Sequence, residues 1–160
     1  MSFVYLGLGS NLGDKRRNIK KALTLMIERV GDILALSDFY ETSSWGYDST
    51  EMYLNTAVKL ETELKPEELL AVTQEIEREI GRRGKTVNGK YQDRIIDIDV
   101  LLYDDLMMRT PKLTIPHPLL HRRIFVLQPL FEIAPDVVHP VLKKTIADIY
   151  HLMSEHDLRN

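Results

Sequence analysis

The sequence predicts an α+β protein with a ferredoxin-like core, in which strands and helices follow one another as βαββαβ. Two observations lead to this prediction: apolar residues recur with a helical period in two segments, and four other segments have the composition or the alternation of strands. A short added pair of strands and C-terminal helices complete the expected fold. No repeat, low-complexity tract or linker interrupts the chain, so we expect one domain over residues 1–160.

The first half of the core begins with an apolar strand at residues 3–8, which Gly9-Ser10-Asn11 ends. Asp14 can cap the helix that follows, and Gly31-Asp32 ends that helix. Residues 33–42 and 53–62 then alternate as two strands around a polar loop. The apolar stripe expected for the helix consists of Ile19, Leu23, Met26, Ile27 and Val30.

The second half of the core begins at Pro66, which suits the first turn of a helix. Glu67 and Glu68 follow it, near the positive end of the helix dipole. Gly81 is placed to end this helix, and residues 95–103 form a strongly strand-like run before the short strand pair expected around 106–113. The stripe that this helix turns to the core consists of Leu69, Val72, Ile76 and Ile80.

Composition excludes several classes of protein. The 160 residues are 44% apolar and 28% charged, enough for a core with a charged surface. A formal charge of −3 argues against coating nucleic acid or a membrane surface by bulk charge. Cysteine is absent, which removes disulfides, thiol nucleophiles and Cys-ligated metals. Without an apolar run of membrane-spanning length or a basic leader, we expect a cytoplasmic protein.

Residues 95–101 form the most informative stretch, Ile-Ile-Asp-Ile-Asp-Val-Leu. Side chains alternate along a strand, so Asp97 and Asp99 share one face and Ile96, Ile98 and Val100 share the other. Two carboxylates one pleat apart suit Mg²⁺, which takes its other ligands from water and substrate phosphates. The alternative is a solvated strand face with two ordinary acids.

A basic segment precedes this strand. Residues 82–94 contain five Lys or Arg residues and one Asp, a net charge of +4 on a chain whose remainder carries −7. Cations on a loop near a metal-binding pair are typical of phosphoryl transfer, and Gly84 and Gly89 would let the loop close as a lid. The simpler alternative is a solvated charged loop.

Other motifs carry weaker signals. Gly7-Leu8-Gly9 does not continue into a dinucleotide-binding fingerprint, because position 12 is Leu and no parallel βαβ unit follows. Tyr53 and Asn55 could stack on and hydrogen-bond to a flat heterocycle, although core packing is commoner for such a tyrosine, and Phe125 has the same ambiguity. His117 lies between two prolines and just before a cluster of His121, Arg122 and Arg123.

Taken together, the motifs resemble those of the 6-hydroxymethyl-7,8-dihydropterin pyrophosphokinase family over essentially the whole chain. Each piece is short, but their joint order is specific. The pieces are Gly9-Ser10-Asn11, Phe39-Tyr40-x-Thr42, Tyr53-Leu54-Asn55-x-Ala57-Val58, Gln74-x-x-Glu77, Gly81-Arg82, Arg94-x-x-Asp97-x-Asp99, Pro116-His117 and Pro129-Leu130-x-Glu132-Ile133-Ala134-Pro135.

The resemblance implies a monomeric enzyme of folate biosynthesis with a ferredoxin-like fold. It would transfer the β,γ-pyrophosphoryl group of ATP to the pterin hydroxymethyl oxygen and release AMP. The resemblance also implies two Mg²⁺ ions bridged by Asp97 and Asp99, with Arg82 and Arg94 on the transferring phosphates.

The same resemblance implies two substrate subsites. The nucleotide subsite would consist of Gln74, Glu77, Val100, Lys112, Leu113, Thr114, His117 and Arg123. The pterin subsite would consist of Thr42, Ser43, Ser44, Trp45, Tyr53, Asn55, Tyr91 and Phe125, with Tyr91 as an aromatic lid residue.

Three segments depart from the family's usual pattern. Gln92-Asp93 replaces a small residue and proline before Arg94, Lys112 replaces a frequent arginine, and Ser43-Ser44-Trp45 replaces a segment that commonly contains proline. A lysine at 112 would contact phosphate as a point charge rather than as a bidentate fork.

Two other functions remain open at this point. A non-catalytic module could bind nucleotide or pterin, but it offers no reason for paired aspartates beside a basic loop. A metal-dependent nuclease or nucleotidyltransferase would want a broader basic surface, with salt-sensitive binding to nucleic acid. We therefore expect small-molecule substrates, no nucleic acid and no membrane.

Overall fold

The computed structural model describes residues 1–42, 52–81 and 95–159. Its helices are α1 (Lys15–Arg29), α2 (Pro66–Ile80), α3 (Ile124–Ile133) and α4 (Ile146–Arg159), with a short 3₁₀ turn η1 (Leu120–Arg122). Its strands are β1 (Ser2–Ser10), β2 (Gly31–Leu36), β3 (Tyr40–Thr42), β4 (Tyr53–Thr62), β5 (Asp97–Tyr103), β6 (Met108–Arg109) and β7 (Thr114–Ile115). No helix in this described part is both long and apolar enough to cross a membrane.

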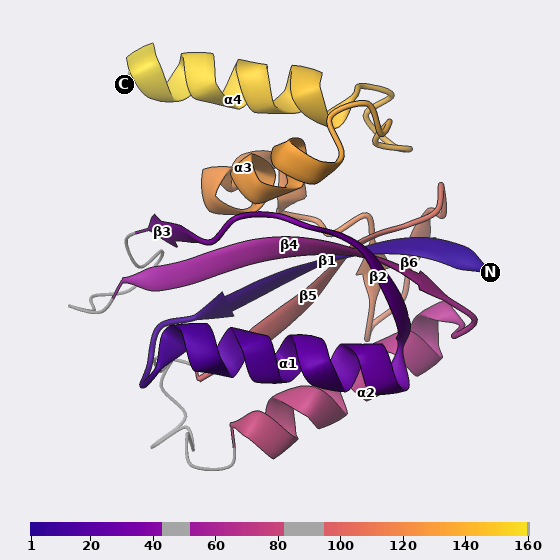
Figure 1. The fold of residues 1–160 in the computed structure, drawn as a ribbon. Coiled ribbons are helices and arrows are strands. Elements are labelled where there is room, and N and C mark those ends of the chain that lie inside the picture. Colours follow the sequence, from indigo (N-terminus) through magenta and orange to yellow (C-terminus); the bar gives the residue numbers. More distant parts are fainter. Residues whose placement is uncertain (43–51, 82–94, 160) are drawn as a thin grey trace.

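The main sheet is antiparallel, with strand order β2-β4-β1-β5 and β3 paired to the far part of β4. Helices α1 and α2 cover one face, α3 covers the other, and α4 lies on α3 (Figure 1). Because the helices connect strands that are not neighbours, β1 and β5 come together although most of the chain separates them. This is the ferredoxin-like α+β arrangement that the order of elements predicted, and it is confirmed.

The sheet separates two cores. One lies under α1 and α2, the other under α3 and α4. The first includes Val4, Leu6, Leu8, Ile19, Met26, Leu60, Leu69, Ile76, Ile98 and Val100. The second includes Tyr5, Ala57, Leu101, Leu102, Leu120, Leu127, Leu130 and Ile149. A shift of register between Tyr5 and Leu6 lets both Leu101 and Leu102 reach the second core, so β5 carries a bulge just after its aspartates.

Helix α1 begins as predicted, because the Asp14 carboxylate accepts the Arg17 N–H at 3.2 Å. Four of the five stripe residues lie buried or nearly so, but Ile27 is 55% exposed, so its assignment to the core was wrong. Ile27 lies 100° around the helix from buried Met26, on the side that faces solvent. Buried Ala22 completes the stripe instead.

Helix α2 also follows the prediction. Pro66 occupies its first turn, and the Glu68 carboxylate accepts the Lys65 N–H at 2.9 Å. Leu69 and Ile76 are fully buried, with Val72 and Ile80 partly buried beside them. Gly81 ends the helix by donating its N–H to the Glu77 carbonyl at 2.8 Å.

The prediction of a single strand at residues 33–42 was wrong, because this segment is divided into β2 and β3. The break comes at Ser37, which is buried. Its N–H donates to the Ala57 carbonyl at 2.9 Å, and its hydroxyl accepts the Ala57 N–H at 2.9 Å. The side chain thus replaces one ladder bond, and the pairing with β4 resumes one residue out of step at Tyr40.

The short added pair is present as β6 and β7, but its second strand lies at 114–115, beyond the predicted 106–113. The turn between the strands holds itself together through Thr110, whose N–H and hydroxyl both donate to the Leu113 carbonyl. The predicted C-terminal helices are confirmed as α3 and α4.

Candidate active site

Asp97 and Asp99 begin β5 and are both half-buried. Their neighbours Ile98 and Val100 point the other way, into the core under α1 and α2. The predicted alternation is confirmed, and it leaves both carboxylates on the side of the sheet that α3 covers.

Glycines stand directly opposite both aspartates. In the register of β1 and β5, Gly9 pairs with Asp97 and Gly7 pairs with Asp99. Cross-strand partners share a face, so the strand beside the carboxylates presents no side chain of its own. The result is a strip of β1 backbone without side chains, defined by Gly7 and Gly9, next to two acids.

The same row continues across β4. Gly9 pairs on its other side with Asn55, which is 7% exposed. A Cβ atom on Gly9 would lie 3.1 Å from Asn55 Oδ1 and 3.4 Å from the Tyr53 ring, so both side chains border the bare strip. The sequence prediction that Tyr53 and Asn55 share a face is therefore confirmed. An amide, a glycine and a carboxylate lie side by side across three strands.

Asn55 is held in one orientation. Its Nδ2 donates to the Thr42 hydroxyl at 2.9 Å, from β3 on the outer side of β4. With that donor engaged, Oδ1 is the atom turned toward Gly9. The structure thus brings together three of the residues assigned to the pterin subsite: Thr42, Tyr53 and Asn55.

His117 approaches the aspartates from the segment after β7. Its Nδ1 accepts the Leu119 N–H at 3.2 Å, which assigns the imidazole proton to Nε2. That nitrogen lies 3.7 Å from Asp99 Oδ1. Burial lowers the pKa of His117, the positive charge of Arg123 lowers it further, and Asp97 partly opposes this. The His117 Nε2 nitrogen therefore faces the Asp99 carboxylate.

Glu77 supports β5 from outside the sheet. Because β5 is an edge strand, the Ile98 N–H has no strand partner, and Glu77 Oε2 accepts it at 2.8 Å. Ile98 is the residue between the two aspartates. Glu77, assigned to the nucleotide subsite from the sequence, thus holds the backbone that carries the acids.

The remaining nucleotide-subsite residues lie along the same edge. Gln74 is exposed on α2, and Val100 and Leu113 belong to one core cluster. Lys112 is exposed in the turn of the short strand pair, and Thr114 begins β7. Contacts between β5 and β7 place this turn beside the acid-bearing strand.

Arg123 and Phe125 come from the beginning of α3. The Arg123 guanidinium carbon lies 5.8 Å from the centre of the Phe125 ring. The positive charge of Arg123 is one of the causes that lower the pKa of His117. Six predicted site residues lie outside the described residues: Ser43, Ser44, Trp45, Arg82, Tyr91 and Arg94. The departures at Gln92-Asp93 lie outside them as well.

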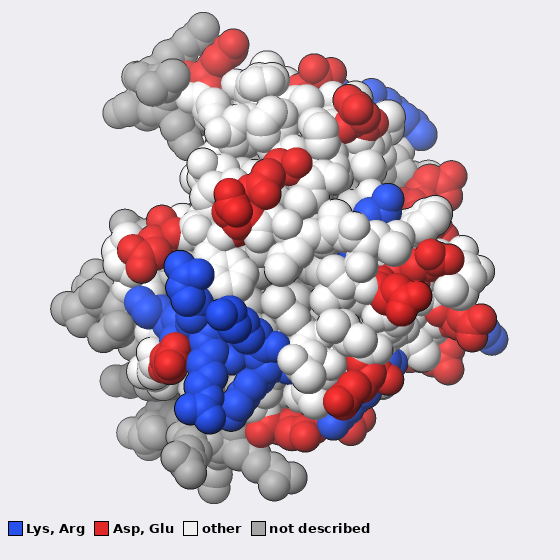
Figure 2. Space-filling view, in the orientation of Figure 1, with Lys and Arg blue, Asp and Glu red and all other residues white. Residues whose placement is uncertain are grey.

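The surface carries a second basic feature that the sequence interpretation missed. Figure 2 shows Lys and Arg gathered over one end of α1. Here Arg16, Arg17, Lys20 and Lys21 border a hollow of about 860 Å³ between α1 and the end of α2. The sequence signal is five basic residues within the seven positions 15–21. The sequence interpretation considered only the basic segment 82–94 and did not consider this second group.

Among the described residues, no group of three or more His, Asp or Glu side chains is placed to hold a metal ion. The donor set at the head of β5 is therefore a carboxylate pair on an open strip. This set fits Mg²⁺, which binds through one or two carboxylates and completes its shell with water and phosphate oxygens.

Comparisons with known proteins identify the family. The family model for 7,8-dihydro-6-hydroxymethylpterin-pyrophosphokinase (HPPK) matches residues 5–135. A 2-amino-4-hydroxy-6-hydroxymethyldihydropteridine pyrophosphokinase of Porphyromonas gingivalis is 48% identical over 141 residues, which cover 88% of this chain and 95% of that protein. The corresponding protein of Aquifex aeolicus is 42% identical over 148 residues, covering 92% and 90%.

Among solved structures, the chain resembles one described as an HPPK-DHPS in complex with substrates, with a TM-score of 0.77 and 16% identity. The match covers 99% of this chain but only 44% of that one, and at this identity it shows the fold alone. The family model and the curated relatives, by contrast, match most of the sequence. This chain belongs to the 7,8-dihydro-6-hydroxymethylpterin-pyrophosphokinase family.

Proposed function

We propose that this protein transfers the β,γ-pyrophosphoryl group of ATP to the hydroxymethyl oxygen of 6-hydroxymethyl-7,8-dihydropterin, in folate biosynthesis. The products are AMP and the pterin diphosphate. The observation that carries the proposal is the row Asn55–Gly9–Asp97. It sets an amide that could hydrogen-bond a heterocycle and a carboxylate that could bind a metal on either side of one glycine.

In this proposal the two aspartates hold Mg²⁺. Two ions bound by Asp97 and Asp99 would neutralise the triphosphate and orient it for in-line attack. The half-exposure of both carboxylates supports this role, since they can reach substrate oxygens. Glu77 keeps their strand in place, and the His117 Nε2–H supports the Asp99 carboxylate from the other side.

The nucleotide would lie along the outer edge of β5. Gln74, Val100, Lys112, Leu113, Thr114, His117 and Arg123 would border it, with backbone groups of Val100 and Leu113 toward the adenine. Their positions on α2, β5 and the strand pair beside it support this arrangement. Lys112, Arg123 and, outside the described residues, Arg82 and Arg94 would supply positive charge to the phosphates.

The pterin would lie over the bare strip between two aromatic rings. Tyr53 lies beside Gly9 on β4, and Phe125, at the beginning of α3, would be the second ring. Asn55 would hydrogen-bond the ring, with Thr42 beside it and Ser43, Ser44, Trp45 and Tyr91 completing the subsite. The fixed orientation of Asn55, with Oδ1 toward Gly9, supports recognition of ring N–H donors.

The transfer itself needs little covalent chemistry from the protein. The pterin oxygen bonds to the β-phosphorus of ATP, the bond from that phosphorus to the α-phosphate oxygen breaks, and the hydroxyl proton leaves to solvent. Positioning and electrostatic stabilisation then account for most of the rate, as in other phosphoryl transfers. The described residues support this view, because His117 Nδ1 already accepts the Leu119 N–H and so is not available to take the hydroxyl proton.

We also propose that the enzyme works in the cytoplasm, as a monomer, without nucleic-acid or membrane partners. Its proposed co-substrate ATP is a cytoplasmic metabolite. The monomeric state is the one that the resemblance to the family implies.

The experiment that tests the function is nucleotide product analysis with ATP, Mg²⁺ and 6-hydroxymethyl-7,8-dihydropterin. We expect AMP to form in step with the pterin diphosphate. Formation of ADP would show a single phosphoryl transfer and contradict the proposal. Tight binding of both substrates without turnover would instead favour the non-catalytic binding module, and salt-sensitive binding of DNA or RNA would favour a nucleic-acid enzyme.

A further inference from the structure

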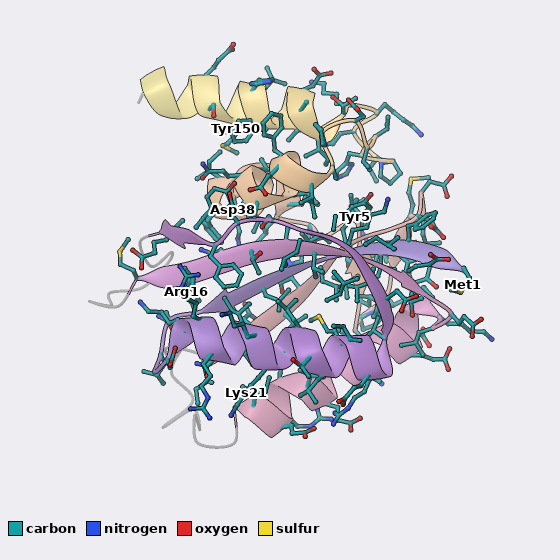
Figure 3. The ribbon with its side chains drawn as sticks, in the orientation of Figure 1. Met1, Tyr5, Arg16, Lys21, Asp38 and Tyr150 are labelled. Carbon is teal, nitrogen blue, oxygen red and sulfur yellow. The ribbon has the colours of Figure 1, made fainter. Side chains whose placement is uncertain are left out.

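A carboxylate on α3 binds the edge strand of the sheet. Glu132 accepts the Asp38 N–H with both of its oxygens, at 3.1 and 3.0 Å, and its Oε1 also accepts the Tyr40 hydroxyl. The hydrogen bond to Glu132, then burial, raises the pKa of Tyr40 to about 12. The hydroxyl therefore remains a donor throughout the neutral range. Figure 3 shows Asp38 on the side of the sheet that faces α3.

One of the two residues that this carboxylate holds, Tyr40, belongs to the row that forms the site. Tyr40 is the cross-strand partner of Asn55, so the row runs Tyr40–Asn55–Gly9–Asp97 across four strands. Two residues beyond Tyr40 lies Thr42, which accepts the Asn55 amide N–H. Glu132 thus fixes the outer end of the row that orients Asn55.

The same helix carries the other wall of the pterin subsite. Phe125 lies seven residues before Glu132, which is about two turns and places both on one face of α3, about 10 Å apart along its axis. One end of this face carries Phe125, and the other end carries Glu132, which is hydrogen-bonded to Asp38 and Tyr40 at the entry to β3. Phe125 and the Thr42–Asn55 pair are thus connected through one helix and one carboxylate.

Phe39 holds the opposite side of the same segment. Its ring packs against the core under α1 and α2, with the Arg16 guanidinium 5.0 Å from the ring centre. Phe39 and Tyr40 point to opposite faces, so the strand that enters β3 is held from both sides. Only the Tyr40 side is connected to the helix that carries Phe125.

We propose that Glu132 is a positioning residue for the pterin subsite: by accepting Asp38 N–H and Tyr40 O–H it holds β3, Thr42 and the Asn55 amide at a set distance from Phe125. The inference rests on the proposed function. It deepens that function by assigning pterin affinity, and not ATP affinity, to a contact outside the substrate strip.

The test compares steady-state kinetics of the wild type with Tyr40→Phe and Glu132→Gln. Tyr40→Phe removes one hydrogen bond to a charged acceptor, so we expect KM for the pterin to rise about tenfold. KM for ATP should stay within about twofold, because the nucleotide edge of β5 lies at the other end of the row. Glu132→Gln keeps an oxygen that can accept a hydrogen bond. We therefore expect this conservative variant to raise KM for the pterin less than Tyr40→Phe does.

The matched control is Tyr103→Phe. It also removes a hydroxyl that donates to an acceptor, here the Leu64 carbonyl, on the opposite face of the sheet. We expect it to lower Tm as much as Tyr40→Phe does and to leave both KM values unchanged. A pterin KM unchanged in Tyr40→Phe, or raised equally in Tyr103→Phe, overturns the inference. If the wild type itself forms no AMP with the pterin, the proposed function fails instead.

Discussion

Gly9 has the strictest steric requirement in the row that forms the site. A methyl group there would lie 3.1 Å from Asn55 Oδ1, closer than ordinary contact, so the amide would have to move. We expect Gly9→Ala to raise KM for the pterin about tenfold, since small displacements of a positioning group carry large kinetic effects. Steady-state kinetics with the pterin varied at saturating ATP measure this.

Gly7→Ala is the control for this substitution. Gly7 is also opposite an aspartate, but the three atoms nearest to its added methyl all belong to the Leu101 side chain, the first of them at 3.4 Å. We expect the pterin KM of Gly7→Ala to stay within about twofold of the wild type. Equal effects of the two variants would show that strand β1 tolerates no side chain at all, and would contradict a specific clash with Asn55.

Asp97 is the residue whose removal should affect turnover most. Asp97→Ala takes away half of the proposed magnesium-binding pair, and we expect kcat to fall at least about a hundredfold with the fold retained. The fold should survive because Asp97 is only half-buried at the first position of its strand. Asp105→Ala, an exposed carboxylate beyond the end of β5, should change neither kcat nor Tm. Full turnover of Asp97→Ala would exclude the metal role.

Helix α1 combines a good cap with an unfavourable first turn. Asp14 caps it, yet the first turn contains Lys15, Arg16 and Arg17 and no acid, against the positive end of the helix dipole. Arg17→Glu would supply the acid at the third position of a capping box. We expect it to stabilise the protein by about 0.5–1 kcal/mol, or roughly 1–4 °C in Tm. Thermal unfolding followed by circular dichroism measures this.

The same change of charge at the other end of α1 should have the opposite sign. Arg29 lies in the last turn, where a cation is favourable, and its Nη1 lies 2.8 Å from Glu79 and 3.5 Å from Glu75 of α2. Arg29→Glu should therefore lower Tm. If both substitutions move Tm in the same direction, net charge rather than helix position controls the effect.

For the molecule as a whole, buried histidines predict sensitivity to acid. Burial lowers the pKa of His139 and of His121, and each is further lowered by a neighbouring charge: His121 for the first, Arg122 for the second. Below the ordinary value of about 6.5, the unfolded chain then binds more protons than the folded one. Stability should be complete above that pH and fall as the pH drops from about 6.5 toward 5.5.

His139→Asn isolates this contribution. The His139 Nδ1 accepts the N–H groups of Val141 and Leu142, and an asparagine oxygen can accept the same donors without titrating. We expect the loss of Tm between pH 7.5 and 5.5 to be smaller in the variant than in the wild type. Parallel Tm–pH curves would show that other groups, the carboxylates among them, account for the acid response.

Local pattern was enough for much of this molecule. The shared face of Asp97 and Asp99, the Asp14 cap and the stripe of α2 depend on neighbours within a few residues, and all three are confirmed. The prediction of one continuous strand over 33–42 was wrong at Ser37. There the buried side-chain hydroxyl, which accepts the Ala57 N–H, replaces a hydrogen bond between the strands. The prediction that Ile27 is buried was wrong, because a helical period alone does not show where the edge of a buried stripe lies.

The sequence by itself determined the order of elements, the carboxylate pair and, through its motifs, the family. Only the tertiary structure decided what stands around that pair: Gly7 and Gly9 opposite it, Glu77 behind it, and Glu132 at the far end of its row. These partners are separated along the chain and meet through strand register and helix packing. Periodicity depends on a few adjacent residues, so it could be predicted from the sequence. Strand register depends on the whole sheet, so it could not.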